Sequence, residues 1–261
     1  MARTRHKGLR AVFADTLLTR HVIVVGYYNV EAKAGKLALV AINIDPVSQE
    51  TFTLDQLFPV GENSTPNGAA GLADQIRTWD QENQTYRYFY LYKKTVGTGK
   101  EKNNHWVENV DGYPLADVTL KAGDSVFFYA QKDQTLSVPG QVPNEAVGIL
   151  KQGLNLVSAG FPTRWNPNDA GTAYWGDTTK FTSNGAAGLA DQIRYWDKEN
   201  QTYRYFYLYK KTVGTGKEKN NCWVENVDGY PLLETPLEIG DGFFFYKQKA
   251  CEIEFKTGLK L

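Results

Sequence analysis

The stretch Thr85–Lys94, TYRYFYLYKK, alternates tyrosine with other side chains, and the same ten letters return at Thr202–Lys211. Successive residues of a β-strand point to opposite faces of a sheet, so this alternation predicts a strand with a row of tyrosines on one face. The opposite face carries Phe89 and Leu91, which form the obvious core pair. We therefore expect β-structure in which the tyrosine row faces outward or toward a partner.

The tyrosine row occurs in two equal copies. Its members are Tyr86, Tyr88, Tyr90 and Tyr92 in the first copy, and Tyr203, Tyr205, Tyr207 and Tyr209 in the second. Tyrosines about 7 Å apart along a strand form a flat stripe that buries apolar area and still hydrogen-bonds through its hydroxyls. Such a stripe suits a protein interface or stacking on sugar rings. The alternative is a row packed beneath a neighbouring strand or the other domain, with its hydroxyls reaching the rim.

The repeat extends well beyond the tyrosine strand. At a shift of 117 residues, Asn67–Leu115 matches Asn184–Leu232 at 46 of 49 positions. The three exceptions are Thr78/Tyr195, Gln81/Lys198 and His105/Cys222. Identity falls sharply after Leu115, although a GD turn and an aromatic FFY strand recur in both copies. Recent copying between the halves and selection for two identical surfaces are the two explanations for this boundary.

The extent of the repeat predicts the domain organisation. We divide the chain into a basic N-terminal arm (1–21), a first β-domain (22–138), a linker (139–144) and a second β-domain (145–261). The linker lies in SVPGQVPN, whose prolines and glycine are typical of a short, stiff joint. A period above about 100 residues is too long for a solenoid. The predicted fold is all-β, with two homologous tandem β-sandwich or β-barrel domains.

Local patterns within one unit predict strands and tight turns. KLALVAINI (36–44) is a mostly apolar run suited to a strand buried on both faces. TLDQLF (53–58) predicts one helical turn with Thr53 as its cap. DQENQ (80–84) has the composition of a hairpin turn, and Asp111–Gly112 is the strongest short turn signal.

The charges are balanced overall but uneven along the chain. Lys+Arg and Asp+Glu both total 29, so nothing indicates a nucleic-acid partner for the whole chain. The basic residues of the arm are Arg3, Arg5, Lys7, Arg10 and Arg20, against Asp15 alone. Such an arm is typical of a solvated or partly ordered terminus, and the alternatives are docking on an acidic surface of a neighbouring copy, on a membrane or on nucleic acid. No apolar run reaches the roughly 18–20 residues of a spanning helix, and no standard signal peptide is present.

No motif in the sequence indicates catalysis or a cofactor. VGTGKEK lacks the preceding Gly and the following Ser or Thr of a phosphate-binding loop. His105 becomes Cys222 in the second copy, which is not expected of an essential base or ligand. We therefore predict a protein that is not an enzyme and holds neither cofactor nor metal. A site built from Asp169, Trp175 and Asp177 is the weaker enzymatic alternative.

The two cysteines are both new to the second unit. Cys222 and Cys251 stand where the first unit has His105 and Gln134. A pair gained in one domain predicts a disulfide between neighbouring strands, with two buried free thiols as the alternative. Closing a loop of roughly 30 residues would stabilise the fold by ~3 kcal/mol in the chain-entropy model. Such a bridge would favour an oxidising location outside the cytoplasm.

The second unit carries a recognisable order of motifs. GLNLVSAGFP (153–162), IRYWDKENQTYRYF (193–206), CWVENV (222–227) and PLEIGDGFFFYKQKACEIEF (236–255) follow one another. This order resembles secreted β-rich repeat proteins of planctomycete- and verrucomicrobia-type bacteria, in which a GxNLVS strand precedes a WD…Y hairpin, a Trp and a G[DE]GFF strand. The resemblance implies a secreted or surface-exposed β-rich protein and no particular activity.

These observations lead to two hypotheses about function. The first is a non-enzymatic structural protein that assembles with itself into an extracellular filament, sheath or surface layer, since repeated surfaces propagate into open chains. In this hypothesis the arm and HVIVVGYYNV (21–30) bind a neighbouring subunit, for example by adding a strand to a sheet edge. The alternative is a tandem carbohydrate-binding module with tyrosine and tryptophan platforms, in which duplication raises avidity.

Overall fold

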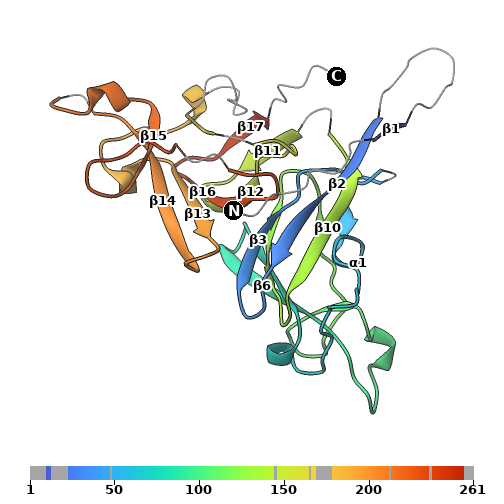
Figure 1. Ribbon diagram of the computed structural model, residues 1–261. Helices are drawn as coiled ribbons and strands as arrows, with labels where there is room; N and C mark the ends of the chain where they lie inside the picture. The colour runs from blue at the N-terminus through green and yellow to red at the C-terminus, as the bar shows by residue number, and fades with distance from the viewer. Residues whose placement is uncertain are drawn as a thin grey trace.

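The computed structural model describes residues 10–12, 23–47, 49–143, 146–164, 166–168, 178–211, 213–234 and 237–255. Over these ranges the chain consists of antiparallel sheets, with one α-helix of four residues and several short 3₁₀ turns (Figure 1). The all-β prediction is confirmed.

Two five-stranded sheets form the frame, and each repeat supplies one. The first sheet has the order β3 (Leu37–Ala41), β9 (Ser125–Tyr129), β5 (Gln75–Asp80), β6 (Thr85–Leu91) and β7 (Trp106–Glu108). The second has the order β12 (Gly153–Ser158), β16 (Gly242–Lys247), β13 (Gln192–Asp197), β14 (Thr202–Tyr209) and β15 (Cys222–Glu225). Corresponding strands of the two repeats therefore occupy corresponding places.

Smaller sheets cover one face of each five-stranded sheet. They are β1 (Arg10–Val12) with β2 (Ile23–Ala32) and β10 (Gln134–Gln141), β11 (Ala146–Leu150) with β17 (Cys251–Phe255), and β4 (Phe52–Thr53) with β8 (Thr119–Leu120). Leu136 and Val138 of β10 share a core with Ile76 and Phe128 of the first sheet. Likewise, Ile253 of β17 lies in the core of the second sheet. Each repeat thus has two layers and its own core.

Neither five-stranded sheet closes on itself within the described residues, so the β-barrel form of the prediction is wrong. The reason lies at the sheet edges. At one edge, β7 receives a single bridge from Leu115 to Val107. At the other, Val40 of β3 is bridged to Asp241 of the second repeat. The two edges of the first sheet therefore have different neighbours and do not pair with each other.

The helical elements are short. The helix α1 (Leu54–Leu57) is capped by Thr53, whose hydroxyl accepts from the backbone N–H of Gln56 while the Gln56 side chain accepts from the backbone N–H of Thr53. The predicted turn and its cap are confirmed. The 3₁₀ turns are η1 (Ala70–Leu72), η2 (Lys100–Lys102), η3 (Thr178–Lys180), η4 (Ala187–Leu189) and η5 (Lys217–Lys219). No helix of the described ranges has the length and apolarity needed to cross a membrane.

The expected linker and arm are only partly described. Residues 139–141 continue β10, and Gln141 exchanges backbone hydrogen bonds with Asp45. A Cβ at Gly140 would lie 2.4 Å from the Asp45 carbonyl oxygen, so glycine is needed where the two chains approach. Of the arm, Arg10 begins β1. Four of its basic residues lie outside the described ranges: Arg3, Arg5, Lys7 and Arg20.

The strand β2 is occupied within its own chain. It pairs with β10 from Val25 to Ala32 and with β1 from Ile23 to Val25. This segment was the strand expected to add to a neighbouring subunit. In the structure it completes the second layer of the first repeat.

Candidate binding surfaces

The tyrosine row lies in three different environments. Tyr88 and Tyr205 are exposed, each at 44%. Tyr86 and Tyr203 are partly buried where the two five-stranded sheets meet. The remaining members are buried: Tyr90, Tyr92, Tyr207 and Tyr209. In both repeats the row therefore has the same three parts. One tyrosine lies at the joint between the sheets (Tyr86 or Tyr203), one is exposed and is called the open position (Tyr88 or Tyr205), and the last two are buried.

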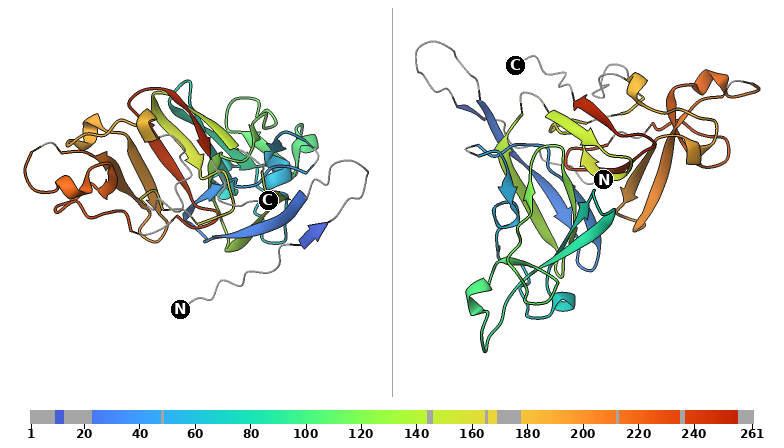
Figure 2. Two further views of the ribbon diagram at one scale, coloured as in Figure 1. Left: turned by 90° about the horizontal axis from the view of Figure 1, so that it is seen from above. Right: turned by 180° about the vertical axis from the view of Figure 1, so that it is seen from behind.

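The joint between the repeats is an aromatic cluster. Phe127 and Phe244 are buried in it, and the hydroxyls of Tyr86 and Tyr203 lie 3.4 Å apart. The ring of Phe244 lies 5.2 Å from Trp79, centroid to centroid, and within 6.3 Å of the other three rings. Edge-to-face contacts of this kind stabilise beyond simple area burial. The two sheets are thus joined by side chains from both repeats. Figure 2 shows the ribbons of the two repeats side by side in two further views.

The β5–β6 hairpin of the first repeat hydrogen-bonds to β12, the first strand of the second sheet. The indole Nε1 of Trp79 donates to the carbonyl oxygen of Leu154 at 2.8 Å. The Gln84 side-chain amide pairs with the same residue, since it accepts from the Leu154 N–H at 2.8 Å and donates to its carbonyl at 3.0 Å. The Gln84 side chain thus makes the two hydrogen bonds to Leu154 that the backbone of a neighbouring strand would make.

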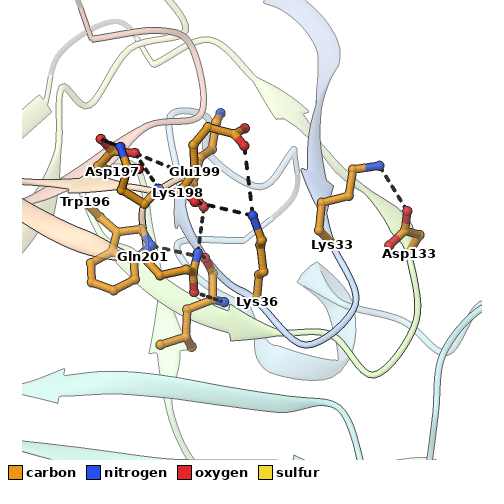
Figure 3. Close-up of polar contacts among 10 residues, drawn as sticks. Lys33, Lys36, Asp133, Trp196, Asp197, Lys198, Glu199 and Gln201 are labelled. Atoms are coloured by element: carbon orange, nitrogen blue, oxygen red, sulfur yellow. Dashed lines mark hydrogen bonds and ion pairs between the residues drawn. The ribbon is translucent and has the colours of Figure 1, made fainter.

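The hairpin of the second repeat makes the same contact in the opposite direction (Figure 3). Trp196 Nε1 donates to the Leu37 carbonyl at 3.1 Å. The Gln201 side chain accepts from the Leu37 N–H at 2.9 Å and donates to its carbonyl at 3.0 Å. Lys36 also donates to the backbone carbonyl of Glu199 at 3.4 Å. The joint is therefore reciprocal, and each repeat holds the other by the same residues.

The hairpin turn is prepared for this contact by its own side chains. Asp80 accepts from the backbone N–H groups of Glu82 and Asn83 and from the Asn83 side chain. These bonds from Asn83 hold the pKa of Asp80 below its usual range. Gln84 has a positive φ of 51°. This left-handed conformation is uncommon outside glycine. The Gln84 side chain bonds both to Leu154 of the other repeat and to the Gln81 carbonyl of its own turn.

Beyond the open position, each sheet carries a second cluster on the same face. Tyr90 and Tyr92 are buried with Ala73 and Val107, and the ring of Tyr113 stacks on Tyr92 at 6.1 Å. Burial raises the pKa of Tyr90 to about 12, so its hydroxyl stays protonated at neutral pH. Tyr207 and Tyr209 form the matching cluster with Tyr230.

Exposed apolar residues surround each of these buried clusters. We call them the first outer surface (Leu72, Val96, Val110, Tyr113 and Leu115) and the second outer surface (Leu189, Val213, Val227, Tyr230 and Leu232). Leu72 ends the η1 turn that covers Tyr90. Val96 lies in the loop that contains Gly99, where an added Cβ would lie 3.2 Å from the Tyr92 hydroxyl. All five pairs are exposed, and four match closely, as with Leu72 and Leu189, both at 62%. The fifth pair differs, with Leu115 at 53% and Leu232 at 38%.

A lysine fixes the turn in each outer surface. Lys102 Nζ donates to the carbonyl oxygens of Gly112 and Tyr113 at 2.8 and 2.9 Å. Lys219 makes the same two bonds in the second repeat at the same distances. The turn at Asp111–Gly112 is thus confirmed as a turn, and its shape is held from the neighbouring loop.

The change from His105 to Cys222 is matched by a second change nearby. His105 Nδ1 lies 2.8 Å from Asp55 Oδ2, and the other oxygen of Asp55 accepts from the backbone N–H of Trp106. In the second repeat, Asn168 accepts from the backbone N–H of Trp223 at 2.6 Å. The Asp55 carboxylate that contacts His105 in the first repeat therefore has the neutral amide of Asn168 in its place where the histidine is absent.

The predicted disulfide is not formed, because Cys222 and Cys251 are both free thiols. Cys222 opens β15 at the edge of the five-stranded sheet, paired with Tyr209. Cys251 opens β17 in the two-stranded sheet, paired with Leu150. The two residues belong to different sheets, and their similar spacing from the first-repeat counterparts does not bring them together.

We expect a maleimide to label both thiols when the unreduced protein is unfolded in denaturant. The physical reason is that a disulfide would leave no thiolate to react. Mass spectrometry counts the adducts, and the reduced protein is the control. Two adducts without reductant agree with the structure, whereas none without reductant and two with it would contradict it.

The remaining candidates contribute little. Asp169, Trp175 and Asp177 lie outside the described residues. Over the described ranges, no three His, Cys, Asp or Glu side chains gather closely enough to hold a metal ion. Compared with known proteins, the chain matches no family model, no curated protein and no solved structure.

Sequence reasoning missed the role of the hairpin tip. Trp79 and Gln84 appear in the sequence only as parts of a turn-like segment that is repeated in the second half. Their identity in both copies was the available signal. Nothing in the pattern indicates that their partner is the main chain of Leu154, because a backbone contact places no demand on the partner's side chain.

Proposed function

We propose that the protein is a non-enzymatic assembly subunit that joins copies of itself through its two outer surfaces, at the cell surface or outside the cell. The observation that carries this proposal is the matched exposure of five apolar residues in each repeat. Exposed clusters of this kind are typical of interaction sites in soluble proteins. Substitutions at exposed positions cost little stability, so packing does not account for the identity of the two surfaces.

The occupant we propose for each outer surface is the same surface of a second copy. Each surface carries both signs of charge on exposed side chains. Lys93, Lys100, Glu101 and Asp111 are all exposed in the first repeat. Two such surfaces placed face to face about a two-fold axis bring opposite charges together around an apolar centre, which is the usual arrangement of a symmetric interface.

The geometry of the frame determines what such pairing produces. The loops of the two outer surfaces, around η2 and η5, project from opposite ends of the molecule (Figure 1). A subunit with one self-complementary surface forms closed dimers, whereas a subunit with two forms an open chain. The reciprocal joint supplies the second surface at a defined distance from the first. The expected product is a linear polymer.

The test is sedimentation velocity over a wide range of protein concentration. We expect the wild type to grow past the dimer as concentration rises. L72E with V110E introduces charges on the first outer surface and should stop growth at the dimer, because the second surface remains. L189E with V227E should do the same from the other end. The four-fold variant should stay monomeric, since both surfaces are lost.

A control keeps the test specific. Val47 is 59% exposed and belongs to neither outer surface, so V47E should leave assembly unchanged. A wild type that remains monomeric at high concentration would overturn the proposal. So would a single-surface variant that still forms long polymers. Circular dichroism verifies that each variant keeps its β-structure.

A second candidate function rests on the open position of the tyrosine row. Tyr88 and Tyr205 are exposed to the same extent, and a guanidinium lies over each ring, from Arg77 at 5.5 Å and Arg194 at 5.6 Å. An aromatic ring beside a fixed cation suits a sugar platform. Binding to a glycan array that is lost in Y88A with Y205A, without polymer growth, would favour this carbohydrate-binding module over assembly.

A further inference from the structure

Two of the three differences within the repeated segment meet at one carboxylate. Tyr195 and Lys198 of the second repeat replace Thr78 and Gln81 of the first. The Tyr195 hydroxyl donates to Asp241 Oδ2 at 3.2 Å, and the Lys198 ammonium lies 3.9 Å from Asp241 Oδ1. The second repeat therefore gives its buried aspartate a phenol and an amine.

The equivalent aspartate of the first repeat has neither partner. Asp124 occupies the position of Asp241 and keeps the one bond that both share, from a backbone N–H of its own turn: Lys121 at 2.9 Å, matching Glu238 at 3.0 Å. Thr78 is too short to reach Asp124 as Tyr195 reaches Asp241. The Gln81 side chain is turned elsewhere, since it donates to Asn155 Oδ1 at 2.8 Å.

Thr78, Gln81 and Asp124 line a cavity of about 730 Å³. Its lining includes Thr78, Gln81 and Asp124 of the first repeat, and Ile149 and Val157 of the second. This volume is within the range of small-molecule sites in proteins. The cavity lies against the joint and is lined by both repeats.

The glycine before each aspartate shows the same asymmetry. A Cβ at Gly240 would lie 3.0 Å from Val30 and 3.3 Å from the ring of Tyr28, because β2 of the first repeat packs there. A Cβ at Gly123 would meet no atom within 4 Å. Val30 pairs with Leu136, and the corresponding pair in the second repeat is Gly148 with Ile253. Gly148, which has no side chain, therefore takes the place of Val30. The space beside the glycine is therefore filled by Tyr28 and Val30 in the second repeat, whereas the matching space beside Gly123 in the first repeat is open.

Charged groups face Asp124 from every side of the cavity. The cations are Lys121 of its own turn, Arg87 of β6 and Lys151 between β11 and β12, and the acids are Asp80 and Glu82 of the hairpin, Glu252 of β17 and the nearby Asp45. Most are already occupied. Glu108 and Asp117 bind Arg87, Glu82 pairs with Lys151, and Asn83 binds Asp80. Asp124 and Glu252 remain as acceptors among the charged residues of this lining.

We propose that this cavity binds a small ligand carrying a protonated amine and a hydroxyl group. In that complex the ligand donates a hydrogen bond from its hydroxyl and places its ammonium beside Asp124, as Tyr195 and Lys198 do for Asp241. The chemical class is therefore a hydroxylated amine of small size. The proposal is independent of assembly, because the cavity lies at the joint and the outer surfaces lie at the ends of the molecule.

The probe for the test is tyramine, which combines a phenol with a primary amine. Isothermal titration calorimetry of the full chain should give one site per molecule. T78Y with Q81K copies the residues of the second repeat into the first, and should weaken binding at least about tenfold because the cavity is filled. D124N keeps the shape of the side chain and should weaken binding as strongly, because the charge is lost.

The second repeat provides a matched control. Y195T with K198Q makes the reverse change at the equivalent position and should leave one tyramine site of unchanged affinity, since Tyr28 and Val30 still fill that side. No binding to the wild type would overturn the proposal. Unchanged binding in both T78Y/Q81K and D124N would also overturn it, as would loss of binding in the control alone.

The pH dependence gives an independent readout. Burial raises the pKa of Asp124 to about 6. Above this value the carboxylate is ionised and attracts the amine, which stays protonated up to a pH of about 10. Affinity should therefore fall as the pH drops through about 6. D124N should abolish this step, whereas the Y195T/K198Q control should retain it. Affinity that is flat between neutral pH and pH 5 would contradict the role of Asp124.

Discussion

K247M should lower the free energy of unfolding by about 3–5 kcal/mol, because it leaves a buried carboxylate without its cation. Lys247 and Asp191 are both fully buried, with Nζ 2.5 Å from Oδ2. The ammonium also donates to the Lys180 carbonyl at 3.0 Å and lies 4.8 Å from the ring of Phe181. Methionine retains the volume of lysine but offers no donor. Urea denaturation measures the loss.

The first repeat contains the matched control for this prediction. There, Ala130 stands in place of Lys247, and Asp74 accepts from the side chain of Gln134 at 3.1 Å. Gln134 corresponds to Cys251. K247A with C251Q therefore copies the first repeat into the second and should lose less stability than K247M, because the glutamine can donate to Asp191 as Gln134 donates to Asp74. A K247M variant as stable as the wild type would mean that the pair contributes nothing to the fold.

F244A should cost about 3–5 kcal/mol and separate the unfolding of the two repeats. Phe244 is only 3% exposed and contacts aromatic rings from both repeats. Its removal opens a cavity at the joint, while the core of each repeat stays intact. Differential scanning calorimetry of the wild type should give one transition, and F244A should give two, with the lower one shifted downward.

The control for F244A is V47A, at a side chain that is 59% exposed and lies outside both outer surfaces. A change at such a position usually alters stability by less than about 0.5 kcal/mol, so one transition at the wild-type temperature is expected. If F244A also unfolds in one transition, the repeats are coupled by more than the aromatic cluster. The reciprocal bonds of Gln84 and Gln201 would then carry the coupling.

The strands could be predicted from local sequence because their signals are local. The tyrosine alternation predicts strands over Thr85–Lys94 and Thr202–Lys211, and the structure has β6 at Thr85–Leu91 and β14 at Thr202–Tyr209. The cap at Thr53 follows from a side chain and a backbone group three residues apart. In both cases the interacting groups lie within a few residues, so the pattern contains the whole interaction.

The environment of the tyrosine row could not be predicted in the same way. A period of two residues indicates which side chains share a face, but it does not indicate what covers that face. Tyr90 is covered by a 3₁₀ turn of its own repeat, and Tyr86 by the other repeat. The thiols present the same difficulty, since sequence spacing did not reveal that Cys222 and Cys251 belong to different sheets.

The reciprocal grip of Trp79 on Leu154 and of Trp196 on Leu37 has the form of a homodimer contact made within one polypeptide. Covalent linkage replaces a bimolecular encounter by an effective local concentration. Dilution that would dissociate two separate subunits therefore leaves this contact in place. In the assembly proposed above, the protein concentration would then determine the length of the polymer but not the shape of each subunit.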